Sequence, residues 1–389
     1  MKTPHHIFLF SVFVIIGSIF VPPSFSEAAT TSLQNTELST TTPISFPPDQ
    51  FFLGKIIKIE SHLDSSEIMG GELKTATVTL FPGNDAKVTI EYGGDFANQS
   101  PSQLHEGDYA IVMKTQPGGE TSYYLVDRLR LPGIIVVVLF FLAVVGSLGG
   151  RRGLGAILGL AISILIIVFG IVPAILSGYN PFLIGFIGTG LIACLSLYLA
   201  HGYNSRTTTA LWSTLITLAI AFCLSLFSVW GVGLFGLGSE EARILSLNLE
   251  NAINLQGLLI IAIVIGTLGV LDDTTINQTH IVHELAEVNP NLTRKELYLR
   301  SLKIGREHIA SLVNTLFLAY IGAFLPLFIA LSLAAEPLWI TLNREVIAEE
   351  IIRSIMGSIA LVLAVPISSF LAARSINKHN LTHSEQHER

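Results

Sequence analysis

Residues 131–150 read LPGIIVVVLFFLAVVGSLGG, a run without a charged side chain. A soluble helix keeps a polar face, whereas a helix that crosses the hydrocarbon core of a bilayer needs about 20 mostly apolar residues. Similar runs follow as far as residue 373, and only 13% of the whole chain is charged. Soluble proteins carry about 25% charged residues. Residues 131–373 therefore predict an α-helical polytopic membrane bundle.

We predict about seven transmembrane spans, separated by short turns or polar segments. Their expected ranges are 132–149, 153–173, 180–200, 208–231, 256–271, 309–334 and 351–373. The fifth range is short for a spanning helix. A cytoplasmic helical loop is expected at 272–307, and a tail at 374–389.

Small residues and prolines add two expectations about how these helices pack. Gly149 and Gly153 have the small-xxx-small spacing that lets membrane helices approach closely, and Gly155 and Gly159 repeat it. Prolines in or beside three of the expected spans predict kinks or helix ends. These prolines are Pro173, Pro326 and Pro366.

The chain before residue 131 has a different composition and predicts an exported β domain. The apolar core of residues 1–26 is too short to span and precedes Ser24-Phe25-Ser26, so we predict a signal peptide or an uncleaved signal anchor. Residues 27–48 form a Ser/Thr/Pro-rich linker, and 49–130 a small all-β domain of OB-like type. Its alternating patterns predict strands at 51–60, 72–81, 86–92, 108–115 and 121–130.

Loop charges give an independent prediction of orientation. If residue 131 lies outside, the inner loops and tail carry Arg151, Arg152, Arg206, Arg294, Lys295, Arg300, Lys303, Arg306, Arg374, Lys378 and Arg389. The outer loops and their edges then carry only Arg243, Arg344 and Arg353. Because short cytoplasmic loops are enriched in Lys and Arg, the β domain is expected outside the cytoplasm and the C-terminus inside.

Composition and motifs exclude several classes of function. The net charge of −7 offers no basic surface for nucleic acid. No Walker loop, nucleophile elbow or zincin helix is present in the sequence. We therefore expect no cofactor and no enzyme activity.

The most unusual stretch is LGVLDDTTINQ at residues 268–278, where two adjacent carboxylates close the short fifth span. Carboxylates within a membrane normally face a cavity or a partner. If the span ends below the surface, Asp272, Asp273, Asn277 and Gln278 would form an oxygen-rich ion or substrate site, as in broken-helix transporters. Alternatively both aspartates lie in the cytoplasmic headgroup zone, and one caps a following helix.

Two further groups are weaker candidates. His280, His283, Glu284 and Glu287 share one helical face and could hold a transition metal, or could be the polar face of a cytoplasmic helix. Asn314 and Thr315 are polar within the sixth span. They could line a path or hydrogen-bond a neighbouring helix.

The same residues carry a family resemblance. The stretch 268–278, together with GREH at 305–308 and AYIGAFLP at 319–326, resembles the signature of the YibE/F-like family of bacterial membrane proteins. The resemblance covers about residues 50–373. It implies a bacterial inner-membrane protein with an exported β domain, from a family of uncharacterised proteins sometimes described as permeases. It implies no mechanism and no site residue.

Three hypotheses for function follow. The first is a transporter or permease, or a subunit of one, that moves a small solute or ion with Asp272 and Asp273 in a cation-sensitive site. The second is an envelope scaffold or signalling protein whose β domain binds a protein or glycan. A membrane-embedded metalloenzyme is a distant third. In each case the lipid bilayer is a partner.

Overall fold

The computed structural model describes residues 50–62, 73–81, 87–93, 104–116, 121–248, 253–333 and 336–376. The expected signal segment and linker, and the tail from residue 377, lie outside these ranges. The chain divides after Val144 into two compact units.

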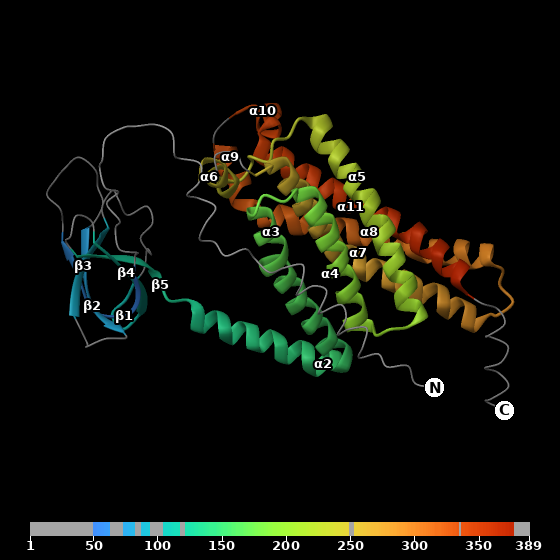
Figure 1. Cartoon of the computed structure of the whole chain (residues 1–389), viewed down its shortest axis with the longest axis horizontal. Coiled ribbons are helices and arrows are strands. Elements are labelled where there is room, and N and C mark those ends of the chain that lie inside the picture. Colours follow the sequence, from blue (N-terminus) through green and yellow to red (C-terminus); the bar gives the residue numbers. More distant parts are fainter. Residues whose placement is uncertain are drawn as a thin grey trace, which may run out of the picture. The chain divides into compact units, whose positions relative to one another are not determined.

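The first unit contains one antiparallel sheet of five strands in the order β3-β2-β1-β4-β5 (Figure 1). The strands are β1 Gln50–His62, β2 Leu73–Phe81, β3 Lys87–Gly93, β4 Tyr109–Thr115 and β5 Ser122–Arg128. All five lie where the sequence predicted strands. The edge strands β3 and β5 lie close together without hydrogen-bonding, so the sheet curls into a half-barrel.

Alternate residues of these strands face inward, as a strand period of two requires. Ile56, Val78, Ile90 and Val112 are almost completely buried and form the interior of the half-barrel. Gly54 is needed where β1 crosses this interior, because a Cβ there would lie 2.4 Å from Cγ1 of Val78.

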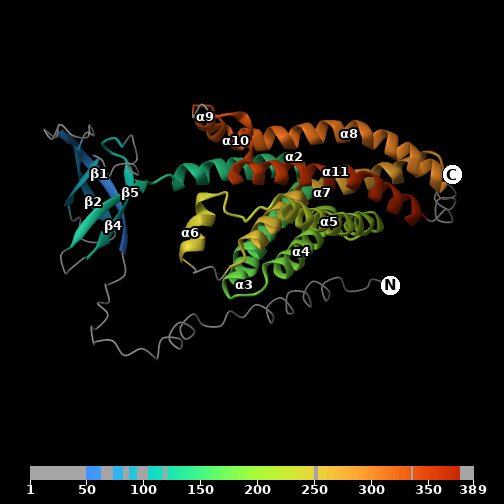
Figure 2. The same ribbon diagram turned by 90° about the horizontal axis from the view of Figure 1, so that it is seen from above.

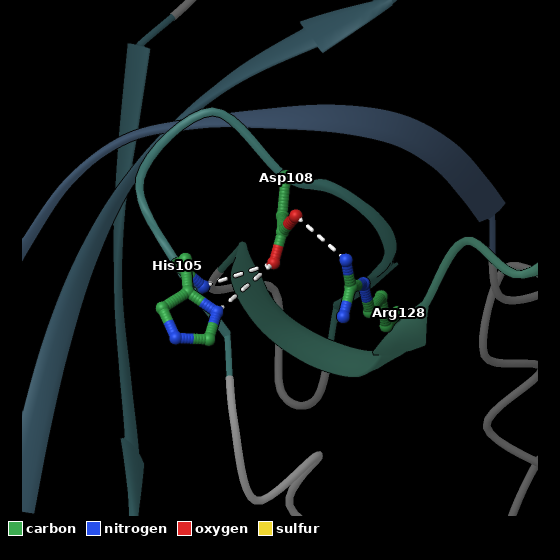
Figure 3. Close-up of polar contacts among 3 residues, drawn as sticks. All are labelled: His105, Asp108 and Arg128. Atoms are coloured by element: carbon green, nitrogen blue, oxygen red, sulfur yellow. Dashed lines mark hydrogen bonds and ion pairs between the residues drawn. The ribbon is translucent and has the colours of Figure 1, made fainter.

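Polar contacts fasten the end of β5 just before the first long helix. Asp108 accepts hydrogen bonds from Arg128 Nη2 at 2.9 Å and from the backbone N–H of His105 at 2.9 Å (Figure 3). Two residues further on, Arg130 pairs with Asp127 at 2.5 Å. The hydrogen bond from Arg130, and then that from the Arg128 backbone N–H, hold the pKa of Asp127 below its usual range.

The rest of the described chain is helical. Its elements are α2 Leu131–Ile166, the π-helix η3 Ile167–Ile171, α3 Val172–Leu176, α4 Pro181–His201, α5 Ser205–Val232, α6 Glu240–Asn248, α7 Leu255–Val288, α8 Arg294–Ala323, α9 Leu325–Leu333, α10 Leu338–Asn343 and α11 Glu345–Ser375. Helices α5, α7 and α11 pack against one another to form the centre of the bundle, α4 packs on α5 and α7, and α8 on α11 and α7. In both ribbon views α6, α9 and α10 lie at one end of this unit (Figures 1 and 2).

Helix α2 contains a sharp break at Gly150, which has φ 54° and ψ −138°. A Cβ on Gly153 would lie 2.4 Å from the carbonyl oxygen of Val145. Residues eight apart in a straight helix are about 12 Å apart. The chain therefore folds back at Gly150, where the sequence predicted the turn between the first two spans. The predicted close packing of glycines occurs at Gly153 and Gly155, whereas Gly149 has open space around it.

The described residues contain five helices that are long and apolar enough to cross a membrane, or six if α8 and α9 form one span. The predicted seven spans are not reproduced as seven helices for two reasons. Residues Leu131–Leu176 count as a single segment of 46 residues, despite the break at Gly150. Helices α8 and α9 are bent by 59° where they meet at Phe324, two residues before Pro326.

Two other proline expectations have different outcomes. Pro173 is the second residue of α3, which follows the π-helix η3 directly, so the helix is irregular there without stopping. Pro366 lies inside α11, which continues as one helix as far as Ser375.

Contrary to the expectation from the sequence, the helix does not end at the Asp-Asp pair. Helix α7 is continuous for 34 residues, and the Asp-Asp pair lies in its middle. The polar residues after the pair are spaced as in a helix with one buried face. Thr275, Gln278 and Thr279 are all buried on that face of α7. The expected loop at 272–307 therefore consists of the second half of α7, the short turn 289–293 and the first half of α8.

Candidate functional site

The carboxyl group of Asp272 lies between α7 and α4, and the residue as a whole is half-buried. The hydroxyl of Ser196 in α4 donates a 2.7 Å hydrogen bond to its Oδ2. Its other oxygen, Oδ1, is buried and has no hydrogen-bond partner among the described residues. Helix α2 packs behind Ser196, since a Cβ on Gly159 would lie 3.4 Å from the Ser196 Cα. A single neutral donor therefore serves this carboxyl group.

Asp273, its neighbour in sequence, has different surroundings. Consecutive residues of an α-helix point about 100° apart, and Asp273 is exposed. Asn277, one turn later on the same face, donates a 2.9 Å hydrogen bond to its Oδ1. The adjacent carboxylates thus form two separate sites, one buried and one at the surface of the bundle.

Two threonine hydroxyl groups lie between α5 and α7 near Asp272. The side chains of Thr214 in α5 and Thr275 in α7 are 2.7 Å apart and form a hydrogen bond between the helices. Thr275 also donates to the backbone carbonyl of Asp272 at 3.3 Å. The interface between α5 and α7 is thus polar without containing a charged partner for Asp272.

Gln278 is buried but joins other helices. Its Nε2 donates to the Ser301 carbonyl of α8 at 2.9 Å and to the Ser369 hydroxyl of α11 at 2.7 Å. Gly305 allows this approach, because a Cβ there would lie 2.9 Å from Oε1 of Gln278 and 2.5 Å from Cγ1 of Val365. We assign Gln278 to packing, and not to the group around Asp272.

Asn314 and Thr315 are not brought to the buried carboxylate. Both are exposed on α8. The Thr315 hydroxyl donates to the Ser311 carbonyl of its own helix at 2.9 Å. The structure therefore gives no contact between this polar pair and Asp272.

The candidate metal ligands form part of an ion-pair surface. Arg206 at the start of α5 pairs with Glu287, and lies 3.6 Å from Glu284. The buried Nε2 of His283 has no hydrogen-bond partner in the described part of the chain. Within that part, no three His, Cys, Asp or Glu side chains are grouped so that they could hold a metal ion. The shared face of His280, His283, Glu284 and Glu287 therefore does not assemble a metal site.

Carboxylates at the start of α11 form a second polar region that the sequence reasoning missed. Glu345 Oε1 accepts hydrogen bonds from the backbone N–H groups of Phe235 at 2.6 Å and Leu237 at 3.3 Å. Glu349 accepts one from Gly238 at 2.9 Å, and a Cβ on Gly238 would lie 2.6 Å from the Glu349 Cδ. The acidic stretch EVIAEE at 345–350, directly before an apolar run, was the available signal.

Ser196 was also missed, because the sequence contains only a weak signal for this residue. It is one serine within a long apolar span, and serines in such spans usually bond to their own helix. Its role depends on α4 and α7 lying side by side, which is a property of the packing.

Long apolar helices with ionisable and hydroxyl groups buried between them define a multi-spanning α-helical membrane protein. Residues 136–378 match the family model described as YibE/F-like protein, and the chain belongs to this family. This confirms the resemblance found in the sequence. No curated protein and no solved structure matches the chain.

Proposed function

We propose that this protein is a permease, or a subunit of one, in the bacterial inner membrane, and that Asp272 binds and releases a cation during transport. The cation is a metal ion or a proton. The observation that supports the proposal is the buried carboxyl group in the middle of α7, whose Oδ1 has no hydrogen-bond partner among the described residues.

The charge on the Asp272 carboxylate is costly in these surroundings. A carboxylate within a membrane span costs several kcal/mol unless it is paired or faces water. Ser196 supplies one hydrogen bond to Oδ2, which is too little to replace full hydration. Binding a cation or a proton at Oδ1 would remove the uncompensated charge. A carboxyl group that is stable only when it holds a cation or a proton is suited to binding and releasing that ion during transport.

The topology that goes with this proposal has seven spans and an exported β domain. The break at Gly150 supports two spans within Leu131–Leu176. The bent pair α8 and α9 would be one span. With α4, α5, α7 and α11, this arrangement puts the turns rich in Lys and Arg in the cytoplasm and the C-terminus with them.

The adjacent aspartates provide a matched test. Purified protein is placed in liposomes loaded with a pH-sensitive dye, and gradients of pH, Na⁺ or K⁺ are imposed in turn. We expect a protein-dependent flux that Asp272→Asn abolishes and that Asp273→Asn, the exposed neighbour, leaves largely intact. Equal flux in wild type and Asp272→Asn would remove Asp272 from the mechanism. No flux above empty liposomes for any of the three ions would contradict ion-coupled transport.

The β unit favours a second candidate, an envelope scaffold or signalling protein. On the outer face of its sheet Phe51, Met113 and Tyr124 lie side by side across β1, β4 and β5. Phe51 is 63% exposed and Tyr124 is 49% exposed, and exposed apolar patches of this kind mark interaction surfaces. Deleting residues 27–130 separates the candidates, because transport should partly survive the deletion and scaffolding should be lost.

A further inference from the structure

We propose that the cation bound and released at Asp272 is a proton and not a metal ion. The inference rests on the proposed function, because it names the ion for the carboxyl group to which that function is assigned. It concerns binding, so it can be tested without measuring flux. Water on either side of the membrane supplies and accepts the proton, so the exchange needs no further reactant.

The free oxygen of Asp272 has closed surroundings. Oδ1 is buried out of reach of solvent and has no hydrogen-bond partner among the described residues. A metal ion bound there would have to leave its water ligands behind, and it needs oxygen ligands at about 2.0–2.6 Å on several sides. A proton adds almost no volume, because it becomes part of the carboxyl group as an O–H bond. The interface between α4 and α7 therefore accommodates a protonated carboxyl group as it stands, whereas a metal ion would have to open it.

The oxygen atoms around this carboxyl group are too few to replace the water ligands of a metal ion. The one hydrogen-bond partner that the described residues give it is the Ser196 hydroxyl at 2.7 Å. The hydroxyl of Thr275 is bonded elsewhere, to Thr214 and to the Asp272 backbone carbonyl. Ca²⁺ takes about six to eight oxygen ligands. Transporters that bind Na⁺ use unwound helices with free backbone carbonyls, whereas α4 and α7 are continuous at this level.

The contacts of Ser196 match a protonated neighbour. Its hydroxyl oxygen lies 2.7 Å from Asp272 Oδ2 and 3.3 Å from the carbonyl oxygen of Ala193. A hydroxyl group has one hydrogen to donate, so an ionised Asp272 and the carbonyl compete for it. When Oδ2 carries a proton, its O–H donates to the Ser196 oxygen, and Ser196 donates to Ala193. Protonation therefore satisfies both contacts at once and also removes the buried charge.

The described residues provide no cationic side chain that pairs with Asp272 and keeps it ionised. Asp273 points about 100° away on the same helix and accepts a hydrogen bond from Asn277. Cys194 lies two residues from Ser196, on the other side of α4. The other titratable groups near this end of α4 and α7 interact with one another, and they are Arg152, His201, Arg206, His280 and Glu284. Neutralisation of Asp272 is therefore left to the proton.

The test is infrared spectroscopy of the full-length protein in lipid bilayers, across the pH range in which it stays folded. The C=O stretch of a protonated carboxyl group is separate from the bands of a carboxylate, so it reports the proton directly. We expect a protonated band that Asp272→Asn removes and that Asp273→Asn, the matched control, leaves in place. Replacing choline by Na⁺, K⁺, Mg²⁺ or Ca²⁺ at constant pH should leave this band unchanged.

Two results would overturn the proposal. A metal ion that binds at Asp272 displaces the proton, so loss of most of the band in any of the four ions would identify that ion as the ligand. Absence of an Asp272-dependent band at every pH tested would show that the group stays ionised.

A second variant tests the contact with Ser196 and keeps the carboxyl group. Ser196→Ala removes the acceptor of the Oδ2 proton, so the C=O stretch of Asp272 should shift to higher frequency. Ser163→Ala is the control, because the Ser163 hydroxyl donates to the Gly159 carbonyl of its own helix. An unchanged frequency in Ser196→Ala would show that no proton lies between the two side chains, and would overturn the proposal.

Proton binding and transport can fail separately. A band of Asp272 that all four metal ions leave unchanged, without flux in liposomes, would contradict transport and support the proton. Flux of Na⁺ or K⁺ that depends on Asp272, with loss of the band in the same ion, would support transport and overturn the proton.

Discussion

Two regions of the helical unit place carboxyl groups among apolar helices, and the surroundings of these groups differ. At the start of α11, Glu345 and Glu349 receive hydrogen bonds from the backbone of the loop that follows α5. In the middle of α7, Asp272 receives one hydrogen bond from Ser196, and its Oδ1 receives none from the described residues. The first region supplies donors to each carboxylate, and the second supplies one neutral hydroxyl.

This difference distinguishes carboxylates that hold a loop in place from the one that we propose binds a cation. Backbone N–H bonds partly compensate the charge of a carboxylate, and the carboxylate fixes the position of the loop that supplies them. A buried carboxyl group with an unused oxygen gains stability when it takes up a cation or a proton. Glu350 is intermediate, because Arg353 serves one oxygen and the other is unused.

The largest effect is expected when a structural carboxylate is removed. Glu349→Ala would leave the buried N–H of Gly238 without its acceptor, at a cost of about 2–3 kcal/mol in the free energy of unfolding. Unfolding of the purified protein in mixed detergent and SDS micelles, followed by circular dichroism, measures the change. Glu240→Ala on α6 is the exposed control. An effect of Glu349→Ala no larger than that of the control would show that the backbone bonds to α11 do not stabilise the bundle.

A somewhat smaller effect is expected from a helix contact beside Asp272. A Cβ on Gly155 would lie 2.3 Å from the Leu199 carbonyl oxygen, whereas one on Gly159 would meet Ser196 at 3.4 Å, an ordinary contact distance. Gly155→Ala should therefore cost about 1–3 kcal/mol through overpacking, and Gly159→Ala should cost much less. The same unfolding assay compares the two variants. Equal effects would mean that α2 and α4 adjust freely, and that Ser196 is not held by this packing.

Removing the charge of Asp272 should change stability least among the buried groups. Asp272→Asn keeps the shape of the side chain and removes a buried charge without a charged partner, so the free energy of unfolding should stay within about 1 kcal/mol of wild type or rise. In the unfolding assay, Asp272→Asn should therefore leave the free energy of unfolding nearly unchanged or raise it, whereas Glu349→Ala should lower it. A loss as large as that of Glu349→Ala would identify Asp272 as a structural group and break the distinction between the two regions.

The sequence predicted the positions of the strands and helices better than the contacts between them. Alternating residues such as Ile56 and Val78 predicted the strands, because burial on one face of a strand leaves a period of two in the sequence. Apolar runs predicted where helices lie. They failed at α7, where Asp272 and Asp273 were taken as a helix end although the helix continues to Val288. A charge inside a helix and a charge at its end look alike until the neighbouring helices are known.

The candidate site shows the same limit. The sequence identified Asp272 as unusual, but it could not separate Asp272 from Asp273, because only the packing of α4 decides which of the two is buried. It also grouped Gln278 and Asn314 with them, although one joins α8 and α11 and the other is exposed. Contacts such as that of Ser196 with Asp272 join residues far apart in sequence, and no local pattern records them.

The smallest effect is expected at Asp127, a solvent-exposed carboxylate near the end of β5. It provides an exposed counterpart to the carboxylates of α7 and α11. Hydrogen bonds from the Arg130 side chain and then from the Arg128 backbone lower its pKa. The folded pKa is below the unfolded value of about 3.9, so the ion pair stabilises the folded form above that pH. This contribution is lost as the pH falls through the folded pKa. An NMR titration of ¹³C-labelled aspartate carboxyl groups in the full chain should give a low midpoint for Asp127, which Arg130→Gln raises. An identical midpoint in Arg130→Gln would show that the guanidinium does not set it, and that exposed donors of this kind hold a carboxylate more weakly than the loop amides at α11.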